Sequence, residues 1–315
     1  MNGRVVALSG GIGGAKLALG LSRILPADEL VVVANTGDDF EHLGLAISPD
    51  LDTLMYTLTG LADEAQGWGL AGESWGFMSM LGRLGGERWF RLGDRDLAVH
   101  VERTRRLRGG ASLTRVTADL CTALGLGVTV LPMSDDPVRT RCETDEGWLD
   151  FQDYFVRRRC EPRVIRLEYR GAERARPNPA TLAALKDPAL RAVIICPSNP
   201  WLSIAPILAV PGMRQAIVAC TAPVVAVSPI IAGRAVKGPT AKIMAELGFV
   251  PNAAAALAYY DGLLDAVIVD PIDASDPGAY GAPMAVADTL MTNLPEKIAL
   301  AARTLEVARS VPSTR

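Results

Sequence analysis

Cysteine and histidine are scarce in this chain of 315 residues, which contains five cysteines and two histidines. The cysteines are widely spaced and no CxxC pair occurs, so neither a zinc knuckle nor a disulfide framework is expected. Two histidines are too few for a histidine-rich metal cage. The chemistry of this protein must therefore rest on other side chains.

Long apolar runs are also lacking, and none reaches the ~18 residues of a membrane-spanning helix. The N-terminal stretch reaches glycine and lysine too early for a secretory signal, so we expect a cytoplasmic protein that makes no membrane contact. The net charge of -3 argues against a broad surface for nucleic acid. Hydrophobic residues make up 49% of the chain, which excludes disorder as the main state.

The first 35 residues predict a strand, a glycine-rich turn, a helix and a second strand. Apolar runs cover residues 5–8 and 30–34, and residues 15–25 have helical spacing. A βαβ unit of this kind has parallel strands.

Short apolar runs and helical patterns then alternate along the chain. Strands are predicted at residues 128–131, 193–196, 224–227 and 266–269, and helices at 113–124, 181–185, 212–219, 241–247, 253–263 and 296–308. This alternation predicts an α/β fold with a doubly wound, mostly parallel, Rossmann-like sheet.

Two segments depart from this alternation. Residues 135–176 contain an alternating stretch at 164–169, which predicts antiparallel strands in a small β/loop subdomain. We interpret it as a soft insertion within one domain that spans residues 1–315. Residues 60–110 are rich in Gly, Trp and Arg, and we expect helices and loops over the active site.

Four glycines lie between the first strand and its helix, in the sequence Ser-Gly-Gly-Ile-Gly-Gly-Ala-Lys. Backbone N–H groups and the helix dipole make such a place a recurrent anion site. It is not a Walker loop, because Leu17 follows Lys16, and it lacks the third glycine of the dinucleotide fingerprint. A tight turn without a ligand is the alternative. The predicted phosphate-binding residues are Gly10, Gly11, Gly13, Gly14 and Lys16.

Carboxylates follow the second strand, where Asp38 and Asp39 stand after Asn-Thr-Gly and Asp50 and Asp52 stand after Pro49. Mg²⁺ binds one or two carboxylates together with substrate phosphates. We predict Mg²⁺ as the cofactor, with Asp38 and Asp50 as its ligands. Helix capping is the alternative, and one of Asp50 and Asp52 is expected to be only a cap.

Polar loops containing proline follow three other predicted strands, at residues 131–137, 197–200 and 228–239. Parallel strands end at one edge of a sheet, so these loops should form a rim around one site. The predicted nucleotide-binding residues in them are Ser198, Asn199, Ser228, Lys237 and Gly238.

Arg91 and Arg95 flank an alternating charged stretch, and their guanidinium groups are candidate anion clamps. A salt-bridged loop is the alternative. His42 is interpreted as a structural histidine.

Several long motifs resemble those of the 2-phospho-L-lactate transferase family (CofD/FbiA). The resemblance covers nearly the whole chain through SGGIGGAK, NTGDD, ISPDLDTLMYTL, WFRLGDRDLA, RGGASLT, LPMSDDPV, FQDYFV, PSNPWLSI, VAVSPIIAG, VKGPTAK and ADTLMT.

The resemblance implies an enzyme of coenzyme F-420 biosynthesis. It would move a phosphoacid from a guanosine diphosphate donor to the terminal ribityl hydroxyl of the deazaflavin Fo, releasing GMP with Mg²⁺. Phospholactate, phosphoenolpyruvate and phosphoglycerate donors all stay open. A homodimer is implied as well. Asp50 and Asp52 are the expected catalytic residues, with Asp52 either orienting the hydroxyl or acting as general base, and the expected Fo-binding residues are Asp52, Thr53, Arg91 and Arg95.

A second class of function stays open. CofD-like regulatory proteins resemble this chain in the glycine loop, and are thought to bind a UDP-sugar without catalysing transfer. They tend to have a glycine- and serine-rich stretch after the double Asp, whereas this chain has Phe-Glu-His-Leu-Gly at 40–44. That difference favours the transferase.

Overall fold

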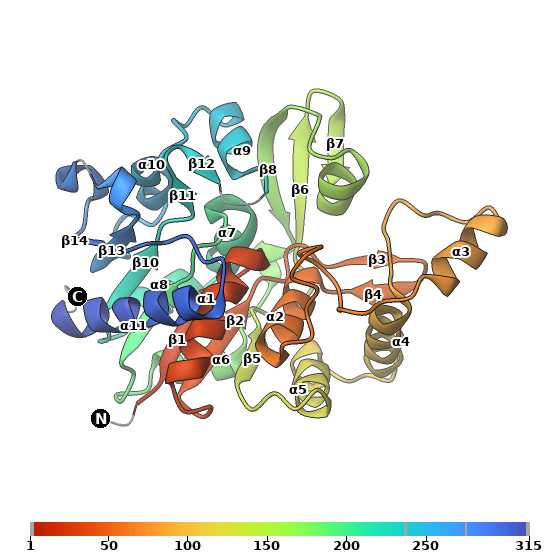
Figure 1. Ribbon diagram of the computed structural model, residues 1–315, viewed down its shortest axis with the longest axis horizontal. Coiled ribbons are helices and arrows are strands. Elements are labelled where there is room, and N and C mark those ends of the chain that lie inside the picture. The colour runs from red at the N-terminus through yellow and green to blue at the C-terminus, as the bar shows by residue number, and fades with distance from the viewer. Residues whose placement is uncertain (1–2, 236–237, 275, 313–315) are drawn as a thin grey trace.

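A seven-stranded parallel sheet forms the centre of the computed structural model, which describes residues 3–235, 238–274 and 276–312 (Figure 1). The strand order is β14-β13-β10-β9-β1-β2-β5, and every pairing in this sheet is parallel. The strands are β1 (Val5–Ser9), β2 (Leu30–Ala34), β5 (Thr129–Pro132), β9 (Ala192–Ile195), β10 (Val224–Val227), β13 (Ala266–Val269) and β14 (Met284–Val286).

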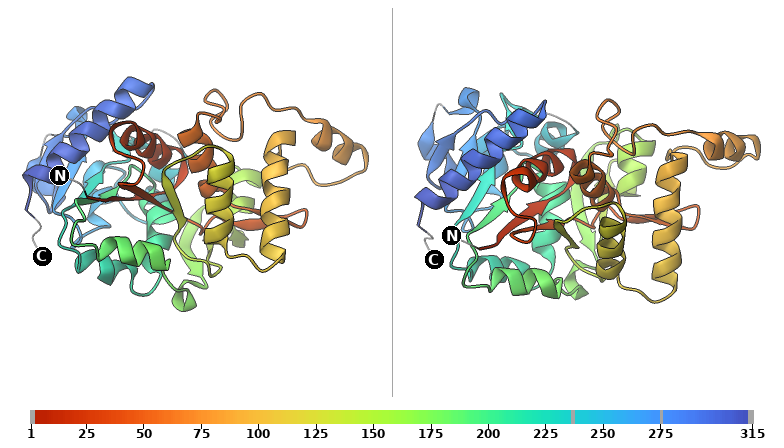
Figure 2. Two further views of the ribbon diagram at one scale, coloured as in Figure 1. Left: turned by 90° about the horizontal axis from the view of Figure 1, so that it is seen from below. Right: turned by 60° about the horizontal axis from the view of Figure 1, so that its bottom comes forward.

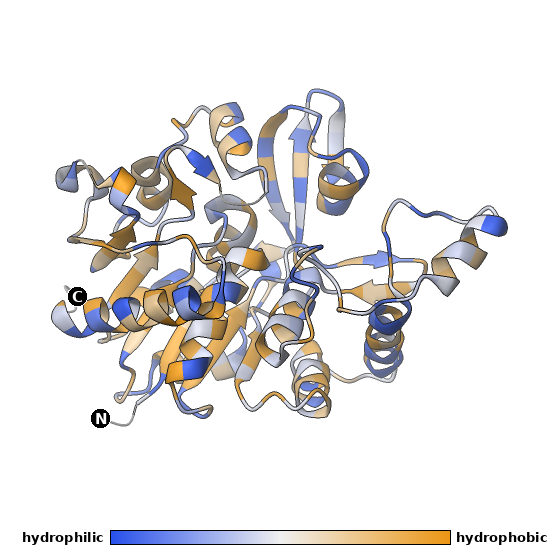
Figure 3. Ribbon diagram, in the orientation of Figure 1, coloured by the Kyte–Doolittle hydropathy of each residue, from blue (hydrophilic) through white to orange (hydrophobic). Residues whose placement is uncertain are grey.

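Side chains of the central strands are buried on both faces of the sheet. In β1, Val5 and Ala7 join the core on one face, while Val6 and Leu8 join the core on the other. Strands covered on both sides read as continuous apolar runs, which is why the sequence revealed them. Figure 3 shows the apolar residues gathered on these strands.

Helices cover both faces, as the predicted doubly wound fold requires (Figure 2). One face packs against α1 (Gly11–Ile24), α2 (Pro49–Thr59), α5 (Leu113–Ala123) and α11 (Leu294–Ser310). The other packs against α6 (Pro179–Leu185), α7 (Ala205–Ala209), α8 (Met213–Val218) and α10 (Ala253–Ala258). The prediction of an α/β sheet with helices on both sides is confirmed.

The antiparallel strands predicted within residues 135–176 are present. They form a three-stranded sheet of β6 (Arg139–Thr144), β7 (Gly147–Asp150) and β8 (Val164–Arg170). The helix α9 (Thr240–Glu246) contacts β8. Two short hairpins were not predicted, and they pair β3 (Phe40–His42) with β4 (Leu45–Ile47) and β11 (Ile230–Ile231) with β12 (Arg234–Ala235).

Residues 60–110 include α3 (Gly76–Arg83) and α4 (Asp94–Arg108). Figure 1 shows α3 at the tip of an arm that projects away from the central sheet. The sequence predicted helices over the strand ends, but α3 does not lie there (Figure 1). The helix α4 packs against β4. No helix in the described part of the chain is long and apolar enough to cross a membrane.

The chain changes direction across the sheet between β1 and β9. From β1 it adds β2 and β5 on one side, and it later adds β9, β10, β13 and β14 on the other. The carboxyl ends of β1 and β9 thus form a topological switch point, where doubly wound sheets bind their ligands.

Candidate active site

The glycine loop after β1 packs directly on the loop after β9. The N–H of Gly10 donates to Oγ of Ser198 at 3.2 Å. A Cβ on Gly13 would lie 2.3 Å from the carbonyl oxygen of Pro197, and one on Gly14 would lie 2.4 Å from Oγ of Ser198. The predicted proximity of Ser198 to the glycine loop is confirmed, and close packing between the two loops explains these glycines.

Asp50 occupies the amino end of α1. Its Oδ1 accepts the N–H of Gly11 at 2.7 Å, and its Oδ2 accepts Nδ2 of Asn35 at 2.9 Å. The carboxylate therefore complements the dipole of α1, and it does not cap its own helix. Because Gly10 and Gly11 donate to Ser198 and Asp50, part of the predicted phosphate loop already binds groups of the protein. The nucleotide-binding role of the loop stays a prediction.

Asp38 and Asp39 are buried beside Asp50. Burial is the main cause that raises the pKa of Asp38 well above its ordinary value, and the charge of Asp50 adds to this. Burial also raises the pKa of Asp39 to about 7 and that of Asp50 to about 6. Within the described residues, none of the three carboxylates forms a direct ion pair with a basic side chain.

These carboxylates fit a divalent cation. Oδ1 of Asp38 and Oδ1 of Asp39 are buried and find no hydrogen-bond partner in the described part of the chain. Nδ2 of Asn35 donates to Asp50, and the same residue partly offsets the raised pKa of Asp38. Two carboxylates that leave room for phosphate oxygens suit Mg²⁺. Its binding here stays a prediction.

Asp52 lies on another side of α2, where it binds Arg103 of α4 through both carboxylate oxygens. Ser48 is the N-cap residue of α2, so the capping alternative for Asp52 does not describe this structure. The side chain of Asp52 is buried, and its role in catalysis or Fo binding stays a prediction.

Thr53 and Lys16 line one cavity of about 280 Å³ between α1, α2 and the start of α11. Nζ of Lys16 donates to the carbonyl oxygen of Met291 at 2.6 Å. Trp68 lines the same cavity, and the guanidinium of Arg91 lies 5.9 Å from its ring centroid and 4.1 Å from that of Trp75. Of the predicted Fo-binding residues, Thr53 lines this cavity, and Arg91 contacts only Trp68 at its wall.

The stretch around Arg95 begins α4 and is anchored by hydrogen bonds. Asp94 accepts the N–H groups of Gly76 and Phe77 at the start of α3, and Arg95 donates to the carbonyl of Ala71. These are hydrogen bonds and not the ion pairs of the salt-bridged alternative, and Arg95 is exposed. A role of Arg95 in binding Fo stays a prediction.

Two of the other predicted nucleotide-binding residues, Asn199 and Ser228, bind nearby backbone groups. Oδ1 of Asn199 accepts the N–H groups of Trp201 and Leu202, and Oγ of Ser228 bonds with the backbone of Ile230. Gly238 has a φ of 76°, and Lys237 lies outside the described residues. Nucleotide contacts by these four residues stay predictions.

Asn35 and Arg103 were missed by the sequence analysis. Asn35 stands in the Asn-Thr-Gly-Asp-Asp motif, a pattern that indicates an acidic turn and no role for the amide. Arg103 lies in an arginine-rich helix that suggests a solvated face, yet its side chain is almost fully buried. Its signal was the spacing from Asp96 and His100, which places all three on one side of α4.

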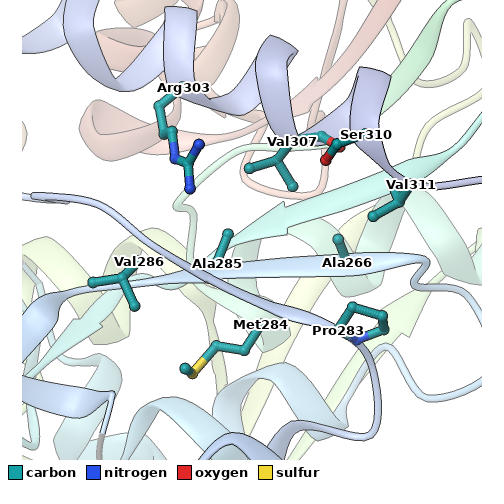
Figure 4. A pocket seen from close by; sticks show the side chains of 9 residues that line it. All are labelled: Ala266, Pro283, Met284, Ala285, Val286, Arg303, Val307, Ser310 and Val311. Carbon is teal, nitrogen blue, oxygen red and sulfur yellow. The ribbon is translucent and has the colours of Figure 1, made fainter.

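A second hollow of about 410 Å³ lies at the far edge of the sheet, between β14 and α11 (Figure 4). Its lining is mainly apolar, and Arg303 and Ser310 are its polar members. It contains none of the predicted site residues, so we assign the chemistry to the switch point.

Comparisons with known proteins agree on one family. The family model described as 2-phospho-L-lactate transferase CofD matches residues 5–286. A phosphoenolpyruvate transferase of Streptomyces avermitilis is 41% identical over 98% of this chain and 99% of its own. A 2-phospho-L-lactate transferase of Methanosarcina mazei is 40% identical over 92% of this chain and 95% of its own.

Solved structures agree on the fold. A crystal structure of a UPF0052 family protein from Bacillus halodurans superposes with a TM-score of 0.63 at 16% sequence identity, covering 97% of this chain and 99% of that one. At this identity the likeness concerns the fold alone. The family match and the two transferases carry the assignment, and the chain belongs to the 2-phospho-L-lactate transferase (CofD) family and is a transferase.

Proposed function

We propose that this enzyme transfers a phosphoacid from a guanosine diphosphate donor to the terminal ribityl hydroxyl of Fo, releasing GMP. The relatives in Streptomyces and Methanosarcina are named for phosphoenolpyruvate and for 2-phospho-L-lactate. We propose that the donor carries an acid of this type, and that the reaction belongs to coenzyme F-420 biosynthesis in the cytoplasm.

The observation that carries this proposal is the group of buried carboxylates at the switch point. Asp38 and Asp50 have raised pKa values because they are buried, and an oxygen of Asp38 is unpartnered among the described residues. A divalent cation would supply the positive charge that these carboxylates lack, and the donor diphosphate would supply further oxygen ligands to that cation.

In the proposed reaction, the ribityl oxygen forms a bond to the phosphorus on the acid side of the donor. The bond from that phosphorus to the bridging oxygen breaks, GMP leaves with the bridging oxygen, and the hydroxyl proton passes to solvent or to phosphate. Positioning and charge neutralisation dominate phosphoryl transfer, so no protein nucleophile is required. A bound Mg²⁺ would be held by Asp38 and Asp50 and would neutralise charge on the diphosphate.

Asp52 and the glycine loop have separate tasks in this proposal. Asp52 orients the ribityl hydroxyl, and Thr53 and Arg91 bind Fo around the cavity beside α2. The loop after β1 and Ser198 border the donor phosphates. Orientation of two reactants can account for a large part of the rate.

The deciding experiment incubates the enzyme with Fo, Mg²⁺ and one guanylated acid at a time, with mass detection of GMP and of the deazaflavin product. We expect a product with phosphoenolpyruvate or phospholactate donors. The regulatory alternative predicts no product with any donor, together with thermal protection by a UDP-sugar. Protection by GDP with Fo supports the transferase.

A further inference from the structure

A buried arginine connects α4 to the first turn of α2. Arg103 is 1% exposed, and its two terminal nitrogens bind the two oxygens of Asp52, with Nη1 to Oδ2 at 3.1 Å. Burying a charged pair is costly unless the geometry is good and other hydrogen bonds are satisfied. Such a pair therefore calls for an explanation other than stability.

A second buried group contacts the guanidinium next to Asp52, since Nδ1 of His100 lies 3.7 Å from Oδ2 of Asp52. Nδ1 of His100 lies 3.2 Å from Nη1 of Arg103, and because arginine only donates, this nitrogen must accept. Nε2 of His100 lies 3.2 Å from Oδ2 of Asp96. The hydroxyl of Tyr56 donates to Oδ1 of Asp96 at 2.6 Å. Close contacts thus run from Tyr56 through Asp96, His100 and Arg103 to Asp52, although Nε2 of His100 makes no hydrogen bond within the described residues. Each of these five side chains is buried.

The positive charge in this cluster is supplied by the arginine. Asp52, Asp96 and His100 each offer an atom within 4.8 Å of the others, a spacing that also suits a metal ion. The nitrogens of Arg103 already contact Asp52 and His100. A second cation there would be repelled by the guanidinium, so we do not interpret the cluster as a metal site.

Asp50 and Asp52 hold the first turn of α2 from two sides. Residues two apart on an α-helix differ by about 200° around its axis. Asp50 accordingly reaches Gly11 and Asn35, while Asp52 reaches Arg103. Movement of Asp52 would therefore shift the turn that also carries the predicted metal ligand.

We propose that Arg103 is a positioning residue for the acceptor half of the reaction. It holds the Asp52 carboxylate in one place, so that this group can orient the ribityl hydroxyl, and it does not itself touch a substrate. A carboxylate has about four lone-pair directions, which leaves room for a hydroxyl beside the arginine. The inference rests on the proposed transfer to Fo. Arginine suits the task because its planar fork fixes both oxygens, whereas lysine is a point charge.

The test compares Arg103→Lys with a matched control, Arg191→Lys. Arg191 also forms a partly buried ion pair, with Glu29 at 2.8 Å, but it lies just before β9, at the opposite end of the strands. We expect Arg103→Lys to lower kcat roughly 10- to 100-fold, as a small misplacement near a reacting group does. GDP affinity by calorimetry should stay within about twofold, because the glycine loop is untouched. The control should keep kcat.

A purely structural role makes a different prediction, namely a lower Tm with kcat unchanged for the folded enzyme. The inference is overturned if folded Arg103→Lys turns over at the wild-type rate. It is also overturned if Asp52→Asn and Arg103→Lys reduce kcat independently, because a residue that acts through Asp52 adds little once Asp52 is altered. Wild-type enzyme that transfers to no acceptor would instead remove the proposed function, and this inference with it.

A second variant covers the case in which Arg103→Lys does not fold. The pair Asp52→Glu with Arg103→Lys retains two opposite charges and nearly the same combined length. We expect this pair to recover Tm relative to Arg103→Lys but to stay slow, because the carboxylate sits in a new place. Recovery of both Tm and kcat would show that only the charge pairing matters, and would overturn the inference.

Discussion

The carboxylate of Asp50 binds the backbone N–H of Gly11 at 2.7 Å, although the two residues belong to different helices. The amino end of α1, which attracts anions, therefore already holds a negative charge. In the proposed reaction, donor phosphates at the glycine loop would lie next to this carboxylate and the buried Asp38. Without a cation, the like charges repel one another.

This relationship predicts that GDP binding depends on Mg²⁺. Removing the metal with EDTA should weaken GDP binding by at least about tenfold, which corresponds to ~1.4 kcal/mol. Asp50→Asn should make the remaining affinity less sensitive to Mg²⁺, because one repelling charge is gone. Calorimetry with and without the metal measures both. Equal affinities in EDTA and in Mg²⁺ would contradict this account of the site.

Asp38→Asn should lower turnover by roughly 100-fold or more while the fold survives. Neutralising charge on a transferring group is worth several kcal/mol, and each 1.36 kcal/mol is tenfold in rate. Tm should not fall, because an unpaired buried carboxylate is replaced by a neutral group of the same shape. Asp150→Asn, at an exposed carboxylate of β7, is the control. Normal turnover of Asp38→Asn at limiting Mg²⁺ would remove Asp38 from the site.

The raised pKa values predict how Mg²⁺ affinity varies with pH. The pKa is about 7 for Asp39 and about 6 for Asp50, against an ordinary value of 3.8. The folded protein thus binds protons more tightly than the unfolded chain, and these groups reduce stability as the pH rises from about 4 to 7. Mg²⁺ competes with those protons. The Tm increase caused by Mg²⁺ should be larger at pH 8 than at pH 5.5, and an equal increase would count against a carboxylate site.

Gly13→Ala should destabilise the fold as well as weaken GDP binding. The new Cβ would lie 2.3 Å from the carbonyl oxygen of Pro197, so the two loops must separate. Overpacking of this kind costs about 1–3 kcal/mol. Gly127→Ala is the control, because its Cβ would make an ordinary contact of 3.4 Å with Ala27. An unchanged Tm for Gly13→Ala would contradict this prediction, because it would show that the two loops can separate at no cost in stability.

Arg91→Ala should raise the KM for Fo by about tenfold and leave Tm nearly unchanged. Its guanidinium is exposed and stacks on Trp75, a contact worth about 0.5–1 kcal/mol at such sites. The effect should appear in a saturation series with Fo and not with the donor. Arg83→Ala, at an exposed arginine of α3, should behave as wild type. A wild-type KM for Fo would exclude Arg91 from acceptor binding.

The central sheet was predictable because its strands are buried on both faces and read as apolar runs. β14 and the hairpin of β3 and β4 have three-residue strands, too short for a pattern to develop. The sequence also indicated that the loops of Gly10 and Ser198 would meet, because parallel strands end at one edge.

The partners of the acidic residues were not predictable in the same way. In α4 the buried positions are polar, at Asp96, His100 and Arg103, while Val101 is 48% exposed. Hydrophobic periodicity predicts that the apolar face of a helix is buried, so for α4 it predicts the wrong buried face. The separate directions of Asp50 and Asp52 follow from helical geometry, but which of them meets an arginine depends on where α4 packs.

The central position of β1 has a consequence for synthesis of the chain. β1 pairs on one side with β2, close behind it, but on the other side Val5 pairs with Ala192. During translation, the second edge of β1 therefore stays unpaired until β9 has been synthesised. Until then, the backbone N–H and C=O groups on that edge have no strand partner. Open edges of this kind invite pairing with other chains. We therefore expect a fragment that ends before β9 to aggregate more readily than the whole chain.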